Sequence, residues 1–215
     1  MICFLGTSHA AQHLREAAIK RKVEVTNDPE VADVLFVSED TPTDASGNRD
    51  LAPIRELVTK AATTGAQIVL TSQVPPGFTR SLGIPNIYHQ AETLRIKDAK
   101  ERAYAPDYIA VGGPQGICRA YAEYLMAFHC PILRMSWEDA EFSKIAVNMT
   151  LAAQVDNTNR LAEAASNAGA DWKNVAKAMA LDSRIGPHSY LTPGRWQDSK
   201  HLLRDHVTLE ALSTS

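Results

Sequence analysis

The chain opens with Met1-Ile2-Cys3-Phe4-Leu5-Gly6-Thr7-Ser8-His9-Ala10-Ala11, and this stretch sets the architecture of its first half. Ile2–Leu5 is a short apolar run, which is typical of a buried strand. Gly6 marks the end of this strand. Ala10–Lys22 is rich in Ala, Leu, Glu and Lys and predicts a helix. A strand, a glycine turn and a helix are the first unit of an α/β fold.

The same alternation continues to about residue 135. Asp33–Val37 is a continuous apolar run, which predicts a strand covered on both faces. Helices are predicted at Leu51–Thr64 and Gln115–Phe128. The remaining predicted strands are Gln67–Leu70, Tyr108–Val111 and Pro131–Met135. Strands that alternate with helices in this way predict a doubly wound, mostly parallel sheet.

The pattern changes after Trp137. Glu138–Gly169 contains no proline and no internal glycine, and its apolar residues recur at steps of three and four. These recurring residues are Phe142, Ile145, Met149, Ala152 and Val155. One continuous helix is therefore predicted from Glu138 to about Ala168. Asp171 is placed to cap a second helix, Trp172–Leu181, and a short helix is expected in the tail.

The change near Ser136 predicts two domains, an α/β domain over residues 1–136 and a helical domain over residues 137–215. A chain of 215 residues is long enough to bury a core in each. The net charge of −3 gives no general attraction to nucleic acid or to an anionic membrane. Three widely spaced cysteines and the absence of a signal peptide pattern predict a cytoplasmic protein with reduced thiols. No CxxC or HExxH spacing supports a metal site.

Five segments, in order and with compatible spacing, resemble the UDP-glucose/GDP-mannose dehydrogenase family. The five segments are the Asp33–Val37 strand leading to Thr41-Pro42, Ser72-Gln73-Val74-Pro75-Pro76-Gly77-Phe78, Ala91–Lys97, Ala140–Asn148, and Gly169–Asp171 with Asp182–Gly186. The run Arg184–Gly194, followed by Asp205, resembles the active-site segment of the same family. The resemblance implies a shortened Rossmann-like domain followed by an all-α central domain, which forms the homodimer core in the family. It also implies NAD-dependent oxidation of a CH–OH group on a nucleotide sugar. We expect a homodimer through the 138–168 helix.

The resemblance assigns roles residue by residue. Its catalytic positions are Lys144, Asn148, His201, Asp205 and Glu92. Its cofactor-binding positions are Gly6, Ser8, Ala11, Thr41, Pro42, Gln73, Pro75 and Arg204. Its substrate-binding positions are Arg184, Tyr190 and Gly194. Lys144 and Asn148 are four residues apart, so on a helix they project from one face and are able to stabilise a developing alkoxide. A solvated helix face is the alternative reading of this pair.

The catalytic cysteine of the family falls on His201 when the motifs are aligned without gaps. An imidazole can act as a general base near neutral pH, which would support oxidation of an alcohol to an aldehyde. It cannot form the thioester through which the family completes the second oxidation. Alternatively, His201 is a tolerated replacement in a site that has lost its chemistry.

The dinucleotide fingerprint is also altered. Only Gly6 of the three family glycines remains, and Ser8 adds a side chain where a pyrophosphate needs close approach to the backbone. The family's second strand is missing or reduced to Val23-Glu24-Val25, with Glu24 as a possible substitute for the acid that holds the ribose. Gln73 replaces a family threonine. We therefore expect NAD binding to be weak or lost.

The chain stops at Ser215, where the family continues into a second α/β domain that binds the nucleotide sugar. The leading hypothesis is a nucleotide-sugar dehydrogenase-like protein. The alternative is a non-catalytic paralogue that serves as a dimeric ligand-binding or interaction module. The sequence does not identify the sugar or the nucleotide.

Overall fold

The computed structural model describes residues 1–214, without the side chain of Ile96. Its sheet has six strands in the order β1-β2-β3-β4-β5-β6. The strands are β1 (Ile2–Leu5), β2 (Val34–Val37), β3 (Gln67–Leu70), β4 (Ile87–Gln90), β5 (Ile109–Gly112) and β6 (Ile132–Met135). All neighbours are parallel except β4 and β5. The doubly wound, mostly parallel sheet is therefore confirmed, and β4 is a strand that the sequence pattern did not predict.

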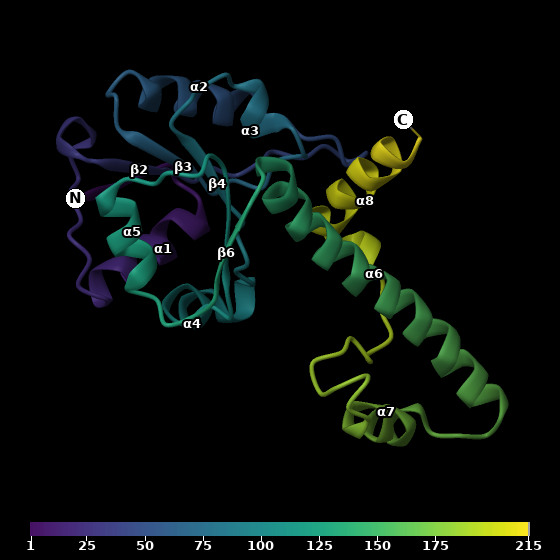
Figure 1. The fold of residues 1–215 in the computed structure, drawn as a ribbon. Coiled ribbons are helices and arrows are strands. Elements are labelled where there is room, and N and C mark those ends of the chain that lie inside the picture. Colours follow the sequence, from purple (N-terminus) through teal and green to yellow (C-terminus); the bar gives the residue numbers. More distant parts are fainter. Residues whose placement is uncertain (215) are drawn as a thin grey trace. The chain divides into compact units, whose positions relative to one another are not determined.

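Helices cover both faces of this sheet (Figure 1). They are α1 (His9–Lys20), α2 (Ala52–Ala62), α3 (Phe78–Ser81), α4 (Ala99–Tyr104) and α5 (Arg119–Met126). Short 3₁₀ turns lie at Pro29–Val31 and Ile96–Asp98. The predicted helices at Ala10–Lys22, Leu51–Thr64 and Gln115–Phe128 match α1, α2 and a shorter α5.

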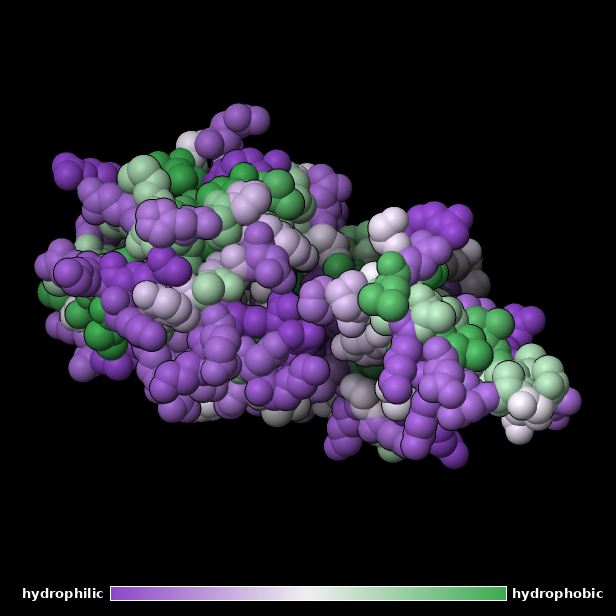
Figure 2. All heavy atoms as spheres, turned by 90° about the horizontal axis from the view of Figure 1, so that it is seen from below, coloured by the Kyte–Doolittle hydropathy of each residue, from purple (hydrophilic) through white to green (hydrophobic). Residues whose placement is uncertain are grey.

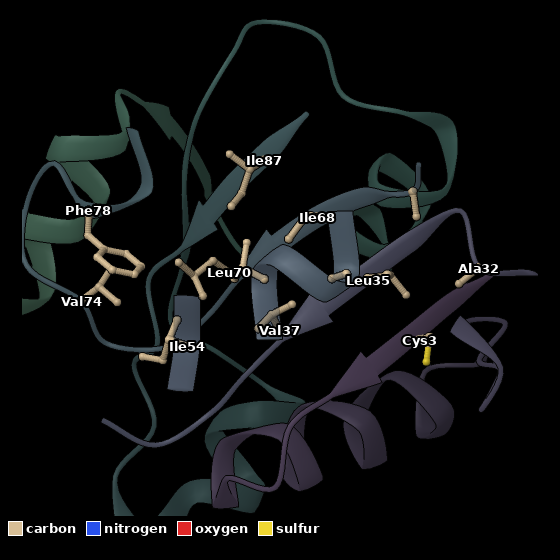
Figure 3. Packing of buried hydrophobic residues seen from close by; sticks show 13 residues of the cluster. Cys3, Ala32, Leu35, Val37, Ile54, Ile68, Leu70, Val74, Phe78 and Ile87 are labelled. Carbon is tan, nitrogen blue, oxygen red and sulfur yellow. The ribbon is translucent and has the colours of Figure 1, made fainter. Parts of the chain in front are cut away.

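Successive side chains of each strand enter two different cores. Leu35 and Val37 of β2 pack in one cluster with Ile54 and Val58 of α2 (Figure 3). Phe36, from the same strand, packs on the other face in a second cluster that contains aromatic residues of α5. A fully buried side chain of this size contributes roughly 1.5–3 kcal/mol. Continuous apolar strands of this kind are explained by burial on both faces.

The predicted remnant strand Val23–Val25 survives as a single bridge. Val25 pairs in parallel with Ile2, and the Ile2 and Thr26 amides each donate to a backbone carbonyl across this bridge at 2.9 Å. β1 is thus flanked by β2 on one side and by this single bridge on the other. This edge of the sheet therefore has one bridge where a full strand was reduced to Val23–Val25.

The chain forms two compact units. The first contains residues 1–42 and 49–144, and the second contains residues 43–48 and the chain from Ile145 onward. Helix α6 (Trp137–Asn167) is continuous, as predicted, and is followed by α7 (Trp172–Leu181), a 3₁₀ turn at Trp196–Asp198 and α8 (Lys200–Ser213). The predicted tail helix is longer than expected. The domain boundary near Ser136 stays a prediction.

The buried face of α6 differs from the predicted apolar stripe. Ile145, Ala152 and Val155 are buried as expected. Phe142, however, is 39% exposed, and the buried face also holds the polar residues Glu141, Asn148 and Thr158. The hydrophobic spacing predicted the helix correctly but placed Phe142 wrongly on its buried face. Because polar side chains are also buried there, the apolar residues alone do not define that face. No helix in the described part of the chain is long and apolar enough to cross a membrane.

His89 of β4 is 2% exposed, and burial lowers its pKa to about 3. Between pH 6.5 and 3 the unfolded chain therefore binds the proton that the folded chain excludes. The free energy of unfolding should fall as pH drops through this window, by about 2 kcal/mol at pH 5. Denaturant unfolding of the wild type and His89→Gln from pH 7 to pH 5 measures this loss. Exposed His188→Gln is the control, and parallel curves for the wild type and His89→Gln would contradict the prediction.

Candidate functional site

The turn between β1 and α1 requires its glycine. Gly6 has a φ of +106°, and a Cβ at this position would lie 2.1 Å from the backbone oxygen of Ser38. Both the left-handed backbone and the close approach of β2 exclude a larger side chain. The structure therefore keeps the tight first turn that the sequence predicted.

Ser8 caps α1 and turns its side chain inward. Its Oγ accepts from the Ala11 amide at 3.0 Å and donates to the Ser38 carbonyl oxygen at 2.9 Å. Ser8 and Ser38 are both buried, and their hydroxyl groups also lie 2.9 Å apart. The predicted cofactor residues Gly6, Ser8 and Ala11 are thus brought together, but Ser8 serves the chain's own helix cap.

A carboxylate of the chain already binds this turn. Glu39 follows β2, and its Oε2 accepts from the Thr7 amide at 3.0 Å. Its Oε1 accepts from the Thr7 hydroxyl, also at 3.0 Å. A dinucleotide would place its negatively charged pyrophosphate at such a turn and use its backbone N–H groups. The residues present do not fit that group well, because a glutamate already uses the Thr7 donors.

Four more predicted cofactor residues, Thr41, Pro42, Gln73 and Pro75, lie after β2 and β3, at the same edge of the sheet. Thr41 is buried, and its hydroxyl donates to the Gln73 carbonyl oxygen at 3.0 Å. The Pro42 carbonyl accepts from Asp50, and the Pro75 carbonyl accepts from Phe78. Carboxyl ends of parallel strands are where ligands bind in open α/β sheets.

Glu92 follows β4 at this edge. Its Oε1 accepts from the Leu94 amide, so the carboxylate caps its own loop. A cavity of about 30 Å³ lies beside it and is lined also by Leu14, Gln90 and Tyr124. Water needs roughly 10–15 Å³, so this space holds one or two water molecules.

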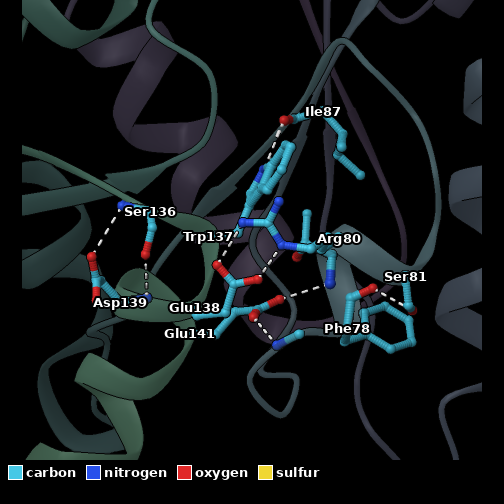
Figure 4. Close-up of polar contacts among 11 residues, drawn as sticks. Phe78, Arg80, Ser81, Ile87, Ser136, Trp137, Glu138, Asp139 and Glu141 are labelled. Carbon is cyan, nitrogen blue, oxygen red and sulfur yellow. Dashed lines mark hydrogen bonds and ion pairs between the residues drawn. The ribbon is translucent and has the colours of Figure 1, made fainter.

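Glu141 is a site-shaping residue that the sequence reading did not single out. Its side chain is 1% exposed and accepts from the amides of Gly77 and Thr79 at 2.6 and 2.7 Å (Figure 4). It thereby fixes the end of the Pro75–Gly77 loop. Burial raises the pKa of Glu141, and the hydrogen bonds from Thr79 and Gly77 oppose that rise.

The first turn of α6 is fixed beside it. The Arg80 guanidinium donates to the Glu138 carboxylate at 2.5 and 2.9 Å and lies 4.7 Å from the ring centre of Trp137. The Trp137 indole donates to the Ile87 carbonyl at 3.0 Å (Figure 4). The start of the helix that carries Lys144 is therefore firmly held on the first unit.

Asn148 and Asp205 form a buried pair in the second unit. The Asn148 side-chain amide donates to Asp205 Oδ2 at 2.6 Å. Asp205 is fully buried and Asn148 is 8% exposed. Lys144 precedes Asn148 by four residues in the continuous helix α6. A hydrogen bond thus joins two of the predicted catalytic residues, which are distant in sequence.

His201 and Arg204 lie on α8 with Asp205. His201 is exposed in the first turn of the helix, whose N-terminus is capped by Ser199. It precedes Asp205 by four residues. Arg204 is buried, at 5% exposure. The two residues share one face of α8, with His201 exposed at the start of the helix and Asp205 buried one turn later.

Side chains of α6 hold the loop that contains the predicted substrate residues. The Thr158 hydroxyl donates to the Tyr190 carbonyl at 2.8 Å. Asn159 exchanges two hydrogen bonds with the Gly194 backbone, at 2.8 and 2.9 Å. The Arg184 guanidinium is paired with Asp182 at 2.8 Å, close to its own position in the loop.

A local signal existed for some of the residues that were missed. Glu141 lies at helical spacing with Ile145 and Asn148, so an acid on the buried face was visible in the pattern. Nothing local connected Glu39 with Thr7, which are 32 residues apart. No group of three or more His, Cys, Asp or Glu residues among those described is arranged to hold a metal ion.

Comparison with known proteins relates the chain to one enzyme family. Residues 138–213 match the central domain of the UDP-glucose/GDP-mannose dehydrogenase family. The chain is 29% identical to a UDP-glucose 6-dehydrogenase of Rickettsia bellii over 169 residues, which cover 72% of this chain and 39% of that protein. It is 30% identical to an uncharacterized protein of Methanocaldococcus jannaschii over 181 residues, which cover 76% of this chain and 20% of that protein. The chain thus spans less than half the length of these relatives.

A similar fold is found among solved structures. A UDP-glucose dehydrogenase from Pyrobaculum islandicum matches 99% of this chain and 64% of its own length, with a TM-score of 0.77 and 23% identity. At this identity the likeness concerns the fold. It agrees with the parallel-dominated sheet followed by a long helix.

Proposed function

Because this chain is a divergent member of the UDP-glucose/GDP-mannose dehydrogenase family, we propose that it is a dehydrogenase-like protein that acts on a CH–OH group of a nucleotide sugar. The observation that carries this proposal is the buried Asn148–Asp205 hydrogen bond of 2.6 Å. A solvated helix face would leave Asn148 in water, whereas here it is 8% exposed and bonded to a carboxylate.

The chemistry of the proposed site follows from its polar groups. An amide donor and a carboxylate, with a lysine one helical turn earlier, would orient a hydroxyl group and stabilise negative charge on its oxygen. The imidazole of His201 would accept a proton near neutral pH. The same groups provide no thiolate, so we propose oxidation no further than the aldehyde.

The cofactor in this proposal is NAD, bound weakly. The contacts would come from Gly6, Ser8 and the loops of Thr41 and Pro75, at the carboxyl edge of the sheet. The Glu39 carboxylate on Thr7 supports weak rather than tight binding. When bound, NAD would supply the hydride acceptor that oxidation of the alcohol requires, while His201 would take the hydroxyl proton.

A second function is favoured by that same carboxylate. If Glu39 keeps dinucleotides away entirely, the chain would be a non-catalytic paralogue that binds a nucleotide sugar or another chain. A thermal-shift screen with NAD, NADP, UDP-sugars and GDP-sugars separates the two functions. Stabilisation by both a nucleotide sugar and NAD supports the dehydrogenase, since a ligand that binds the native state raises the melting temperature. Stabilisation by a sugar nucleotide alone supports the second function. No stabilisation by any sugar nucleotide contradicts the dehydrogenase and, for the second function, leaves only binding to another chain.

We also propose that the chain is a homodimer through α6. Large hydrophobic side chains are exposed on the second unit, including Val147 at 43% and Leu161 at 38%. Figure 2 shows hydrophobic residues at the surface among hydrophilic ones. Exposed apolar side chains on a long helix suit helix–helix packing between chains.

Light scattering at micromolar concentration is expected to give twice the chain mass of 23.5 kDa. Val147→Glu should shift the protein toward the monomer, because a charge would be buried in the interface. Lys60→Glu, at an exposed position of α2, is the control and should leave the dimer intact. A monomeric wild type would refute the proposal.

A further inference from the structure

We propose that Glu39 is a built-in anion that occupies the diphosphate position at the β1–α1 turn and restricts dinucleotide access. This inference concerns the cofactor turn of the proposed function and rests on that function only for the identity of the dinucleotide. The contact between Glu39 and Thr7 involves only residues of this chain. A carboxylate and a pyrophosphate compete for the same donors.

The geometry makes Glu39 a two-oxygen ligand of Thr7. Each carboxylate oxygen lies 3.0 Å from one Thr7 donor, the amide nitrogen for Oε2 and the hydroxyl for Oε1. Oε1 also accepts from the Asp40 amide at 3.2 Å. The carboxylate therefore takes three donors, two of which belong to the turn.

The backbone of Glu39 is itself held in place. Its amide donates to Ser72 Oγ at 2.8 Å, which ties the end of β2 to the end of β3. The preceding residue, Ser38, is buried against Ser8 of the same turn. The backbone that carries the side chain is thus already ordered, so only side-chain entropy is lost when Glu39 binds Thr7.

The charge of Glu39 acts in the same direction as its hydrogen bonds. The N-terminus of α1 has a partial positive charge, which a carboxylate neutralises before any ligand arrives. An incoming diphosphate would meet this negative charge and would have to displace it. Thr7 is exposed and Glu39 is only half-buried, so the displacement requires no unfolding. We therefore expect competition rather than complete exclusion.

Asp40 provides a matched control. It is the next residue, is exposed, and has the same charge, whereas the carboxylate that binds the Thr7 amide and hydroxyl belongs to Glu39. Replacing either acid by its amide changes the net charge by the same amount. A difference between the two variants therefore reports on the contact with Thr7 and not on general electrostatics.

The test titrates wild type, Glu39→Gln, Glu39→Ala and Asp40→Asn with NAD by calorimetry. The same four proteins are titrated with inorganic pyrophosphate while the Thr7 amide is followed by NMR. Melting curves confirm that each protein is folded, and Glu39→Gln, which preserves the shape, serves if Glu39→Ala does not fold. We expect both Glu39 variants to bind NAD and pyrophosphate at least tenfold more tightly than the wild type. Asp40→Asn should change either affinity less than twofold.

The outcomes distinguish failure of the Glu39 inference from failure of the proposed function. A gain for pyrophosphate without a gain for NAD supports the role of Glu39 and contradicts NAD as the cofactor of the proposed function. No gain for either ligand, or an equal gain in Asp40→Asn, overturns the inference.

Discussion

Asn148→Leu is expected to lower the free energy of unfolding by about 2–3 kcal/mol. The substitution removes the amide that donates to Asp205 at 2.6 Å and leaves a fully buried carboxylate without that donor. A hydrogen bond to a charged group is worth about 1.5–3 kcal/mol, and the partner left behind keeps its desolvation cost. Chemical denaturation at pH 7 measures the change.

The control and a double-mutant cycle make this expectation specific to the pair. Asn157→Leu changes an exposed asparagine of the same helix and should stay within about 0.5 kcal/mol of the wild type. Adding Asp205→Leu to Asn148→Leu should cost less than the sum of the single changes, because no carboxylate is then left without its donor. Additive effects would show that the two side chains do not stabilise each other.

The main elements of the fold were predictable because each depends on a local pattern of apolar and polar residues. The apolar run of β2 and the uninterrupted α6 are visible without any tertiary information. β4 was missed because Ile87-Tyr88-His89-Gln90 mixes two apolar with two polar residues, all of which are buried. Gln90 is accommodated by a hydrogen bond from Tyr121 at 3.1 Å, which depends on α5. A buried polar strand of this kind follows from its neighbours in space and not from its own sequence.

The candidate site was predictable only in part for the same reason. Motif spacing identified Asn148 and Asp205, and the structure joins them across 57 residues. Motif spacing could not predict that Arg184 pairs with Asp182, because an exposed arginine is able to reach several partners. Nor could it predict that Glu39 binds Thr7. That contact requires knowing that β1 and β2 are adjacent.

The wild-type protein is expected not to convert UDP-glucose fully to UDP-glucuronate. Oxidation of an aldehyde to a carboxylate proceeds from a tetrahedral adduct at the aldehyde carbon, and a thiolate is the effective nucleophile for that adduct. The resembling motif has His201 at the nucleophile position, and an imidazole forms no stable thioester. Cys3, Cys118 and Cys130 all belong to the first unit, whereas His201 and Asp205 belong to the second. A hydrated aldehyde with His201 or Asp205 as base would react much more slowly.

The measurement is NADH formation with UDP-glucose or GDP-mannose in excess, compared among the wild type, Glu39→Gln and His201→Cys combined with Glu39→Gln. We expect no more than one NADH per sugar, at a very low rate, from the wild type. If His201 and Glu39 are the only changes that prevent the full reaction, the double variant should also oxidise the aldehyde and form a second NADH. If it stays inactive while binding NAD, the sugar pocket is also lost. Two NADH per sugar from the wild type at an enzyme-like rate would show that His201 does not limit the reaction, because an adduct must then form without the thiolate.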